Sequence, residues 1–307
     1  MEKIGQVHLD FEFYSGSDLY SDGDIEEVIL DIVRENETGN YEKIIKQTKS
    51  WPILYHLSDV RKNIINWYPF KKGADILEIG AGCGAITAGL TENDCNVTAV
   101  DLSKRRSLIN AYRNREKQNL QILVGNFNDV AEGIQKEFDY VTLIGVLEYA
   151  GIYIPGKNSA DMFLEKIYNL LKANGRLIIA IENQMGLKYF AGCKEDHVGK
   201  FFEGIEGYPT TDGIQTYSKK ALQSLLERNS FAEIEFYYPY PDYKFPDRIY
   251  SDEMLPQKGE LVENARNFDA PRMNLFDESK VWNTVIEAGM FPEMSNSFLV
   301  IAKKRER

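Results

Sequence analysis

The sequence has few of the residues that mark disulfide-built, metal-stapled or membrane-spanning proteins. Its 307 residues include three widely separated cysteines and no Cys-x-x-Cys pair, so neither a disulfide framework nor a structural zinc site is expected. No apolar run reaches the roughly 18–20 residues that a membrane span needs, and the first residues lack the basic and apolar regions of a signal peptide. We therefore expect a protein of the reducing cytoplasm without a membrane span.

Basic charge is also scarce. The chain has 36 Lys and Arg against 47 Asp and Glu, a formal net charge of -11. Residues 1–40 hold eleven of the acidic side chains against Lys3 and Arg34. The chain therefore has no basic stripe that could follow a phosphate backbone, and a nucleic-acid partner is not expected. The acidic stretch itself is typical of a solvated leading segment.

What the sequence does contain is an ordinary globular composition, 43% hydrophobic and 27% charged, with a regular alternation of strands and helices. Apolar spacing first predicts a helix from Ile25 to Val33 and a second from Leu57 or Ser58 to Trp67. Strands are then predicted at 74–80, 95–103, 120–127, 138–147, 176–183, 231–238 and 297–304, with helices following the first turn and at 104–117, 161–175 and 218–228. This alternation predicts an α/β fold with a mainly parallel sheet covered by helices on both faces.

Two long stretches interrupt the alternation, at 184–217 and 239–296. Loops of this length inside a compact domain are usually functional, so we expect these insertions and the N-terminal extension to form a cap over a cofactor-binding core. The predicted organisation is an acidic extension at 1–50, a core at 51–183, a substrate-side insertion at 184–217, further core at 218–238, an aromatic-rich insertion at 239–296, and a last strand with a tail at 297–307.

The clearest motif is a glycine-rich turn between the first predicted core strand and its helix. The apolar strand ends in Gly80-Ala81-Gly82-Cys83-Gly84. Glycines permit a tight turn and close approach of the backbone to a ligand, while a helix N-terminus presents free N–H groups. Asp101 ends the next strand, 21 residues after Gly80, where an acidic side chain can bind ribose hydroxyls. The two features together predict a nucleoside-binding site.

Glu78 completes the pattern E-x-G-x-G-x-G, which resembles motif I of the class I S-adenosyl-L-methionine (SAM)-dependent methyltransferases; a nicotinamide site prefers G-x-G-x-x-G. The resemblance covers about 74–182 and the last strands. It implies a Rossmann-like sheet of order 3-2-1-4-5-7-6 with the last strand antiparallel, SAM as cofactor and S-adenosyl-L-homocysteine as product. The residues that it and the nucleoside argument assign to the cofactor are Glu78, Gly80, Ala81, Gly82, Gly84, Asp101, Leu102, Asn126, Phe127, Ile144, Gly145 and Leu147.

Three cofactor assignments leave alternatives open. Asn126 stands where the family usually has Asp, although its amide can still pair with the adenine edge. Tyr55 and Arg61 precede the core on a segment that could fold over SAM, where Arg61 could pair with the methionine carboxylate. An exposed helix arginine is the other interpretation of Arg61.

Three further segments, at 55–70, 182–192 and 237–246, resemble methyltransferases that accompany glycosyltransferases in bacterial surface-polysaccharide synthesis. The resemblance implies O-methylation of a sugar or glycan, with a glycosyltransferase as a candidate partner. The alternatives are a protein or small-metabolite methyltransferase, and a SAM-binding partner of glycosyltransferases that has lost its chemistry.

Removal of a proton from an acceptor hydroxyl requires a base, and the chain offers three candidates. His197 lies in the first insertion beside Glu195 and Asp196, either of which could orient it; the alternative is a surface or packing histidine. Glu182 ends the fifth core strand and Glu148 follows the fourth, where open parallel sheets bind ligands, although either carboxylate could instead serve in a salt bridge or helix cap. No metal-ligand cluster stands out in the sequence, so no metal is expected.

Aromatic residues are concentrated between Phe236 and Tyr250, where seven of fifteen residues are Phe or Tyr. Tyrosines match the apolar faces and hydroxyl edges of sugars, so this stretch could line an acceptor cleft. Equally, the rings could pack the second insertion onto the core or form a homodimer contact.

Overall fold

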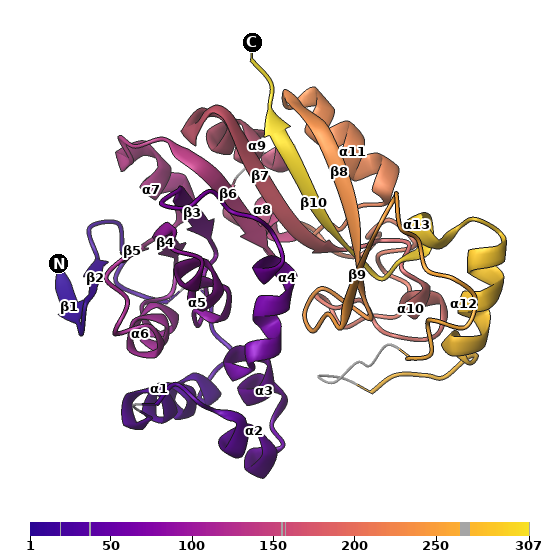
Figure 1. The fold of residues 1–307 in the computed structure, drawn as a ribbon, viewed down its shortest axis with the longest axis horizontal. Helices are drawn as coiled ribbons and strands as arrows, with labels where there is room; N and C mark the ends of the chain where they lie inside the picture. Colours follow the sequence, from indigo (N-terminus) through magenta and orange to yellow (C-terminus); the bar gives the residue numbers. More distant parts are fainter. Residues whose placement is uncertain (19, 37, 155, 157, 265–270, 307) are drawn as a thin grey trace. The chain divides into compact units, whose positions relative to one another are not determined.

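The computed structural model describes residues 1–18, 20–36, 38–154, 156, 158–264 and 271–306. The chain forms two compact units (Figure 1). Unit 1 comprises Met1–Leu143 and Asn169–Arg176, and unit 2 comprises Ile144–Tyr168 and the chain from Leu177 onward. Among the described residues, no helix combines the length and the apolar character needed to cross a membrane.

Unit 1 is built around a mainly parallel set of strands. These are β1 (Glu2–Ile4), β2 (Val7–Asp10), β3 (Asp75–Ile79), β4 (Asn96–Asp101), β5 (Leu120–Val124) and β6 (Phe138–Ile144). Their order is β1-β2-β5-β4-β3-β6, with β1 antiparallel to β2 and every other pairing parallel. Ile76, Leu77 and Ile79 of β3 are all buried, because a central parallel strand is covered on both faces.

The first ten residues differ from the expected solvated leader. β2 buries Val7 and Leu9 and exposes His8, the period-two alternation of a strand with one buried face. His8 pairs with Gln121 and Leu9 with Ile122, so the leading segment extends the sheet beside β5. Two short strands of three and four residues carry too little pattern to be predicted from the sequence.

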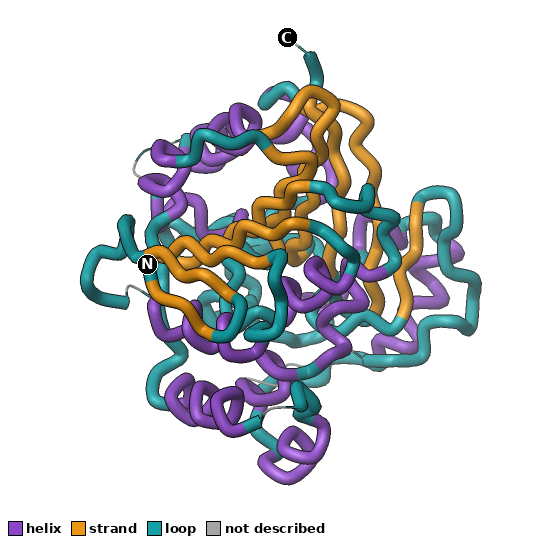
Figure 2. Tube along the Cα trace, turned by 60° about the vertical axis from the view of Figure 1, so that its left-hand side comes forward, coloured by secondary structure: helices purple, strands orange, loops and turns teal. Residues whose placement is uncertain are grey.

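The helices of unit 1 are α1 (Ile25–Glu35), α2 (Glu42–Thr48), α3 (Trp51–Leu57), η1 (Asp59–Lys62), α4 (Asn63–Asn66), α5 (Ala85–Glu92), α6 (Lys104–Arg113) and α7 (Phe127–Gly133). The predicted helix over 25–33 is confirmed; its apolar stripe packs Ile29 and Val33 against Ile53 of α3 and Ile109 of α6. Figure 2 shows the helices in purple and the strands in orange.

Two predicted elements in unit 1 were wrong in extent. The helix expected from 57 or 58 to Trp67 starts after Ser58, which is extended and accepts a hydrogen bond from the Val60 N–H, but it is divided into the 3-10 helix η1 and the short α4. Serine competes for backbone donors in this way, which favours a cap over a helix interior. The strand expected over 120–127 ends at Val124, because Asn126 caps α7.

Unit 2 contains η2 (Leu147–Tyr149), α8 (Ala150–Tyr153), α9 (Ser159–Leu170), β7 (Leu171–Glu182), α10 (Leu187–Phe190), α11 (Lys219–Arg228), β8 (Phe231–Tyr240), β9 (Arg248–Ser251), α12 (Glu278–Glu287), α13 (Phe291–Met294) and β10 (Ser297–Lys304). Its strand order is β7-β10-β8-β9, with β10 antiparallel to β8. Numbered along the seven predicted core strands, unit 1 has the order 3-2-1-4 and unit 2 the order 5-7-6, as the resemblance implied.

The helix predicted over 161–175 ends earlier, at Leu170, and residues 171–175 already belong to β7. Asn174 adopts a left-handed backbone with φ +63°, which a helix does not accommodate but asparagine tolerates.

The aromatic stretch of unit 2 is largely interior. Tyr238, Tyr240, Tyr243 and Tyr250 are buried, and the rings of Tyr238 and Tyr250 meet that of Phe291 edge-on. Edge-to-face pairs of this kind stabilise a core beyond their buried area. Packing of the second insertion accounts for these four rings, and an acceptor cleft lined by the tyrosines stays a prediction.

Candidate cofactor and acceptor sites

The glycine turn of unit 1 has the backbone that only glycine adopts without strain. Gly80, Gly82 and Gly84 have φ of +71°, +52° and +79°. A Cβ on Gly84 would lie 2.3 Å from Asn110 Oδ1 of α6, whereas a Cβ on Gly82 would meet nothing within 4 Å. Gly84 is thus required for packing against α6, while Gly82 leaves space in which a ligand can approach the backbone.

Glu78 lies buried beneath this turn and links it to two helices. Thr87 Oγ1 of α5 donates to Glu78 Oε2 at 2.6 Å, and Asn110 Nδ2 donates to Thr87 Oγ1 at 2.9 Å. Burial raises the pKa of Glu78 to about 8, even though the Thr87 hydrogen bond favours the charged form. Glu78 is therefore mostly a neutral carboxylic acid at pH 7, a structural anchor of the cofactor turn.

Sequence reasoning missed the rest of this network. Asn114 Nδ2 donates to Asn110 Oδ1 at 2.8 Å and to the Gly84 carbonyl at 3.4 Å. Both asparagines are buried on α6, four residues apart on one face. The sequence signal that could have revealed this network is the pair of polar residues, Asn110 and Asn114, on the face of the helix that otherwise faces the core.

Asp101 ends β4 beside the glycine turn. Its Oδ2 accepts from the Gly82 N–H at 2.7 Å and its Oδ1 from the Ser103 N–H at 2.9 Å. Burial raises its pKa, although Arg106 and the two backbone donors favour the carboxylate. Each carboxylate oxygen can accept two hydrogen bonds, so capacity remains for two ribose hydroxyls. Leu102 follows, half-buried, and Ser103 caps α6.

The segment expected to contact adenine follows β5. Asn126 Oδ1 accepts from the Asn128 N–H at 2.9 Å as the cap of α7, and Phe127 is buried. The leading segment covers the start of this region, because a Cβ on Gly125 would lie 2.6 Å from Phe13 Cβ. The contact with Phe13 was not predicted, since nothing in the sequence ties residue 13 to residue 125.

Arg61 and Tyr55 lie together on η1 and α3. The guanidinium carbon of Arg61 is 4.0 Å from the Tyr55 ring centroid. Arg61 is only 6% exposed, so the interpretation as an exposed helix arginine is wrong. Within the described residues, its Nε and Nη1 have no hydrogen-bond partner. Buried donors without partners are rare in folded proteins, and a guanidinium N–H can donate a charge-assisted hydrogen bond to a carboxylate such as that of methionine.

The remaining cofactor candidates belong to unit 2: Ile144 is the last residue of β6, and Gly145 and Leu147 follow it. The Gly145 N–H donates to the Ala180 carbonyl at 2.9 Å, with φ at +72°. A Cβ on Gly145 would lie 2.7 Å from Tyr243 Oη, so packing already requires glycine here. Their contact with a cofactor stays a prediction.

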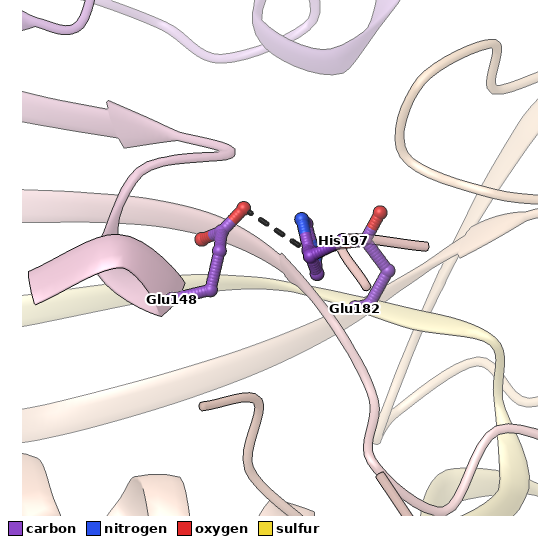
Figure 3. A group of neighbouring side chains, drawn as sticks. All are labelled: Glu148, Glu182 and His197. Carbon is purple, nitrogen blue, oxygen red and sulfur yellow. Dashed lines mark hydrogen bonds and ion pairs between the residues drawn. The ribbon is translucent and has the colours of Figure 1, made fainter. Parts of the chain in front are cut away.

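The three acceptor-side candidates meet in the interior of unit 2 (Figure 3). Glu148 comes from η2, Glu182 from the end of β7 and His197 from the segment after α10. His197 Nε2 lies 3.1 Å from Glu182 Oε2 and 3.8 Å from Glu148 Oε1. The side chains of both glutamates are fully buried and that of His197 is 5% exposed.

Neighbours beyond the trio set its charge state. Glu182 Oε1 accepts from Lys244 Nζ, and Tyr149 Oη lies 2.8 Å from His197 Nδ1. Although burial opposes charge, Lys244 and His197 hold the pKa of Glu182 well below its usual range, and Glu182 raises the pKa of His197 to about 9. Burial raises the pKa of Glu148 to about 7. Without a bound ligand, His197 is therefore mainly an imidazolium, which does not suit the neutral base predicted from the sequence.

Asp196 and Glu195 do not orient the His197 ring as expected. Asp196 accepts from Tyr189 Oη at 2.6 Å and from Lys244 Nζ at 2.8 Å, and it pairs with Lys188. Glu195 accepts from the backbone N–H groups of His197 and Val198. The side chains that orient the ring are instead Tyr149 and Glu182, 48 and 15 residues away in the sequence.

Part of the chain is similar to known methyltransferases. Residues 77–177 match the model of a family described as a methyltransferase domain. An uncharacterized methyltransferase of Staphylococcus carnosus is 29% identical over 153 residues, 50% of this chain and 66% of that protein. A ubiquinone biosynthesis O-methyltransferase of Rickettsia bellii is 25% identical over 173 residues, 52% of this chain and 67% of that protein. The chain thus spans about two thirds of the length of these relatives.

A solved structure supports the fold. The crystal structure of a SAM-dependent methyltransferase from Archaeoglobus fulgidus aligns with a TM-score of 0.50 at 16% identity, over 86% of this chain and 99% of that one. The predicted Rossmann-like class I methyltransferase fold is therefore confirmed. Residues 77–177 therefore match a methyltransferase domain, and S-adenosyl-L-methionine is the cofactor expected for this fold. The open space at Gly82 and the unpaired buried guanidinium of Arg61 fit that ligand.

Proposed function

We propose that this enzyme transfers the SAM methyl group to a hydroxyl oxygen of a sugar or glycan. The observation that carries the proposal is the buried group of Glu148, Glu182 and His197, a polar site that can receive a hydroxyl and its proton. The printed name of the Rickettsia relative, an O-methyltransferase, supports oxygen as the acceptor atom. The likeness of segments 55–70, 182–192 and 237–246 to glycan-associated methyltransferases supports a sugar and favours a glycosyltransferase as partner.

Bound SAM supplies an electrophilic methyl carbon, so the protein has to align a nucleophile with it and accept a proton. Within unit 2, Glu148 is the residue best placed for the proton. It is 1% exposed, and among the described residues neither carboxylate oxygen has a hydrogen-bond partner. Glu182, held as a carboxylate by Lys244, can accept a hydrogen bond from a second acceptor hydroxyl. The proton-accepting role thus passes from His197, the first choice from the sequence, to Glu148.

The test is release of S-adenosyl-L-homocysteine with a panel of free sugars, nucleotide sugars and short oligosaccharides. Glu148→Gln keeps the shape of the side chain but removes the proton acceptor, so kcat should fall by about 10²–10⁴-fold with SAM affinity nearly unchanged. Glu253→Gln, at an exposed position of the same unit, is the matched control and should keep full turnover. Turnover with a peptide or a small metabolite, together with no turnover on any sugar, would refute a sugar as the acceptor.

A second candidate function is a SAM-binding partner of a glycosyltransferase without its own chemistry. SAM binding together with no turnover on any acceptor class, in the presence and absence of such a partner, would favour it. The intact cluster of buried ionisable groups argues against it, because such groups are costly to bury and are concentrated at functional sites.

A further inference from the structure

The trio of Glu148, Glu182 and His197 also has the composition and spacing of a metal site. Each residue offers one ligand atom, and the three atoms lie within 4.8 Å of one another. We propose that these residues bind a divalent cation of the first transition row. Resting on the proposed function, an open coordination position of this cation takes the acceptor hydroxyl and makes it more acidic, and the proton passes to the Glu148 oxygen that does not bind the ion.

The distances suit a shared ion. Bonds from such cations to carboxylate oxygen and imidazole nitrogen are about 2.0–2.2 Å long, so adjacent ligand atoms lie roughly 3 Å apart. His197 Nε2 is already 3.1 Å from Glu182 Oε2 and 3.8 Å from Glu148 Oε1 (Figure 3). Small side-chain movements would therefore complete the coordination without any change of the backbone.

Supporting residues hold two of the three ligands in the orientation that a metal requires. Tyr149 Oη lies 2.8 Å from His197 Nδ1, where it can accept from Nδ1–H and so leave Nε2 free to bind an ion. Lys244 Nζ holds Glu182 Oε1, which leaves Oε2 directed at His197. Metal-ligating histidines and carboxylates characteristically have such outer hydrogen bonds.

Glu148 gives an independent reason to expect a ligand. Both of its oxygens are buried and, within the described part of the chain, neither has a hydrogen-bond partner, while Oε1 points toward His197. A buried carboxylate without a hydrogen bond is costly, and a cation removes that cost. The surrounding ion-pair group is also rich in negative charge: five carboxylates face two lysine ammonium groups. These are Glu148, Glu182, Glu195, Asp196 and Asp242 with Lys188 and Lys244.

The donor set favours a particular kind of ion. Carboxylates suit Mg²⁺, Ca²⁺ and Mn²⁺, whereas imidazole suits Zn²⁺, Fe²⁺ and other transition metals. Two carboxylates with one imidazole and open positions match Mn²⁺ or Zn²⁺ better than an all-oxygen ion. Sequence spacing could not show this set, because its members are 34 and 15 residues apart on three different elements.

The experiment measures metal binding directly, with neither SAM nor acceptor present. Chelator-treated protein is titrated with Mn²⁺, followed by the electron paramagnetic resonance of free Mn²⁺, and separately with Zn²⁺ by calorimetry. The wild type should bind one ion of at least one of the two metals per chain. Glu148→Gln and His197→Ala should weaken binding at least about tenfold. The matched control His8→Ala removes an exposed histidine and should bind like the wild type.

Absence of stoichiometric binding to the wild type overturns the proposal whatever the variants do. So does binding that His197→Ala and Glu148→Gln leave intact. Thermal unfolding of each variant shows whether it is folded. If His197→Ala does not fold, metal binding by the near-isosteric Glu148→Gln tests the proposal instead. The two proposals fail separately. Metal binding without turnover on any sugar refutes the proposed acceptor but supports the metal site. Full turnover on a sugar without metal binding refutes the metal site but supports the proposed acceptor.

Discussion

Glu78 offers a quantitative test of how the cofactor turn is built. Its carboxyl group is buried under the turn, and burial raises its pKa from 4.5 to about 8. A carboxyl whose pKa is raised by folding contributes its full stability below pH 4.5 and loses it as the pH rises through about 8. Each pKa unit corresponds to about 1.4 kcal/mol, so the whole window amounts to a loss of about 5 kcal/mol.

The perturbation is Glu78→Gln, which keeps an acceptor for the Thr87 hydroxyl but cannot ionise. Urea unfolding of the cofactor-free protein at pH 5, 6.5 and 8 gives the free energy of unfolding of each form. Relative to the wild type, the variant should gain about 3–4 kcal/mol between pH 5 and pH 8. Glu116→Gln, an exposed glutamate of the same unit, should show no such trend. A constant difference between Glu78→Gln and the wild type across this range would refute the account of a neutral buried Glu78.

Four further substitutions probe the cofactor site. Gly84→Ala should lower the free energy of unfolding by about 1–3 kcal/mol, because its Cβ meets Asn110 at a left-handed φ. Gly82→Ala should lower the free energy of unfolding less than Gly84→Ala does, and calorimetry should show that it weakens SAM binding more. Arg61→Met should weaken SAM about 10–100-fold without lowering the stability of the cofactor-free protein, since the lost guanidinium donors have no partner there; an equal loss of stability would show a structural role instead. Asp101→Ala should weaken SAM by about 100-fold or more, and unchanged affinity would mean that the ribose lies elsewhere.

The cofactor turn and the core strands were predictable because their signals are local, whereas the strand order was implied by the resemblance to class I methyltransferases. Gly80, Gly82 and Gly84 follow an apolar strand, and Asp101 ends the next, so chain spacing alone brings them together. Hydrophobic runs likewise predicted all seven core strands, with errors in length where Asn126 caps α7 and where Asn174 adopts a left-handed backbone that a helix cannot continue through.

What could not be predicted depends on contacts between distant segments. The sequence singled out Glu148, Glu182 and His197 one by one, but not their meeting, and it paired His197 with adjacent Asp196. In an irregular segment, neighbouring side chains diverge, and Asp196 turns to Tyr189 and the two lysines. The burial of the aromatic stretch was equally hidden, because the same tyrosines suit a sugar cleft or a core.

The central claim is that this enzyme moves a methyl group from SAM to a sugar hydroxyl. The most direct measurement incubates the purified chain with methyl-labelled SAM and the panel of sugar and oligosaccharide acceptors, and follows both S-adenosyl-L-homocysteine and label in the acceptor. We predict one labelled methyl ether per S-adenosyl-L-homocysteine released, lost in Asp101→Ala through binding and in Glu148→Gln through turnover. Label that appears in a protein, in a nitrogen-containing metabolite or in no acceptor, with SAM bound, would contradict the account.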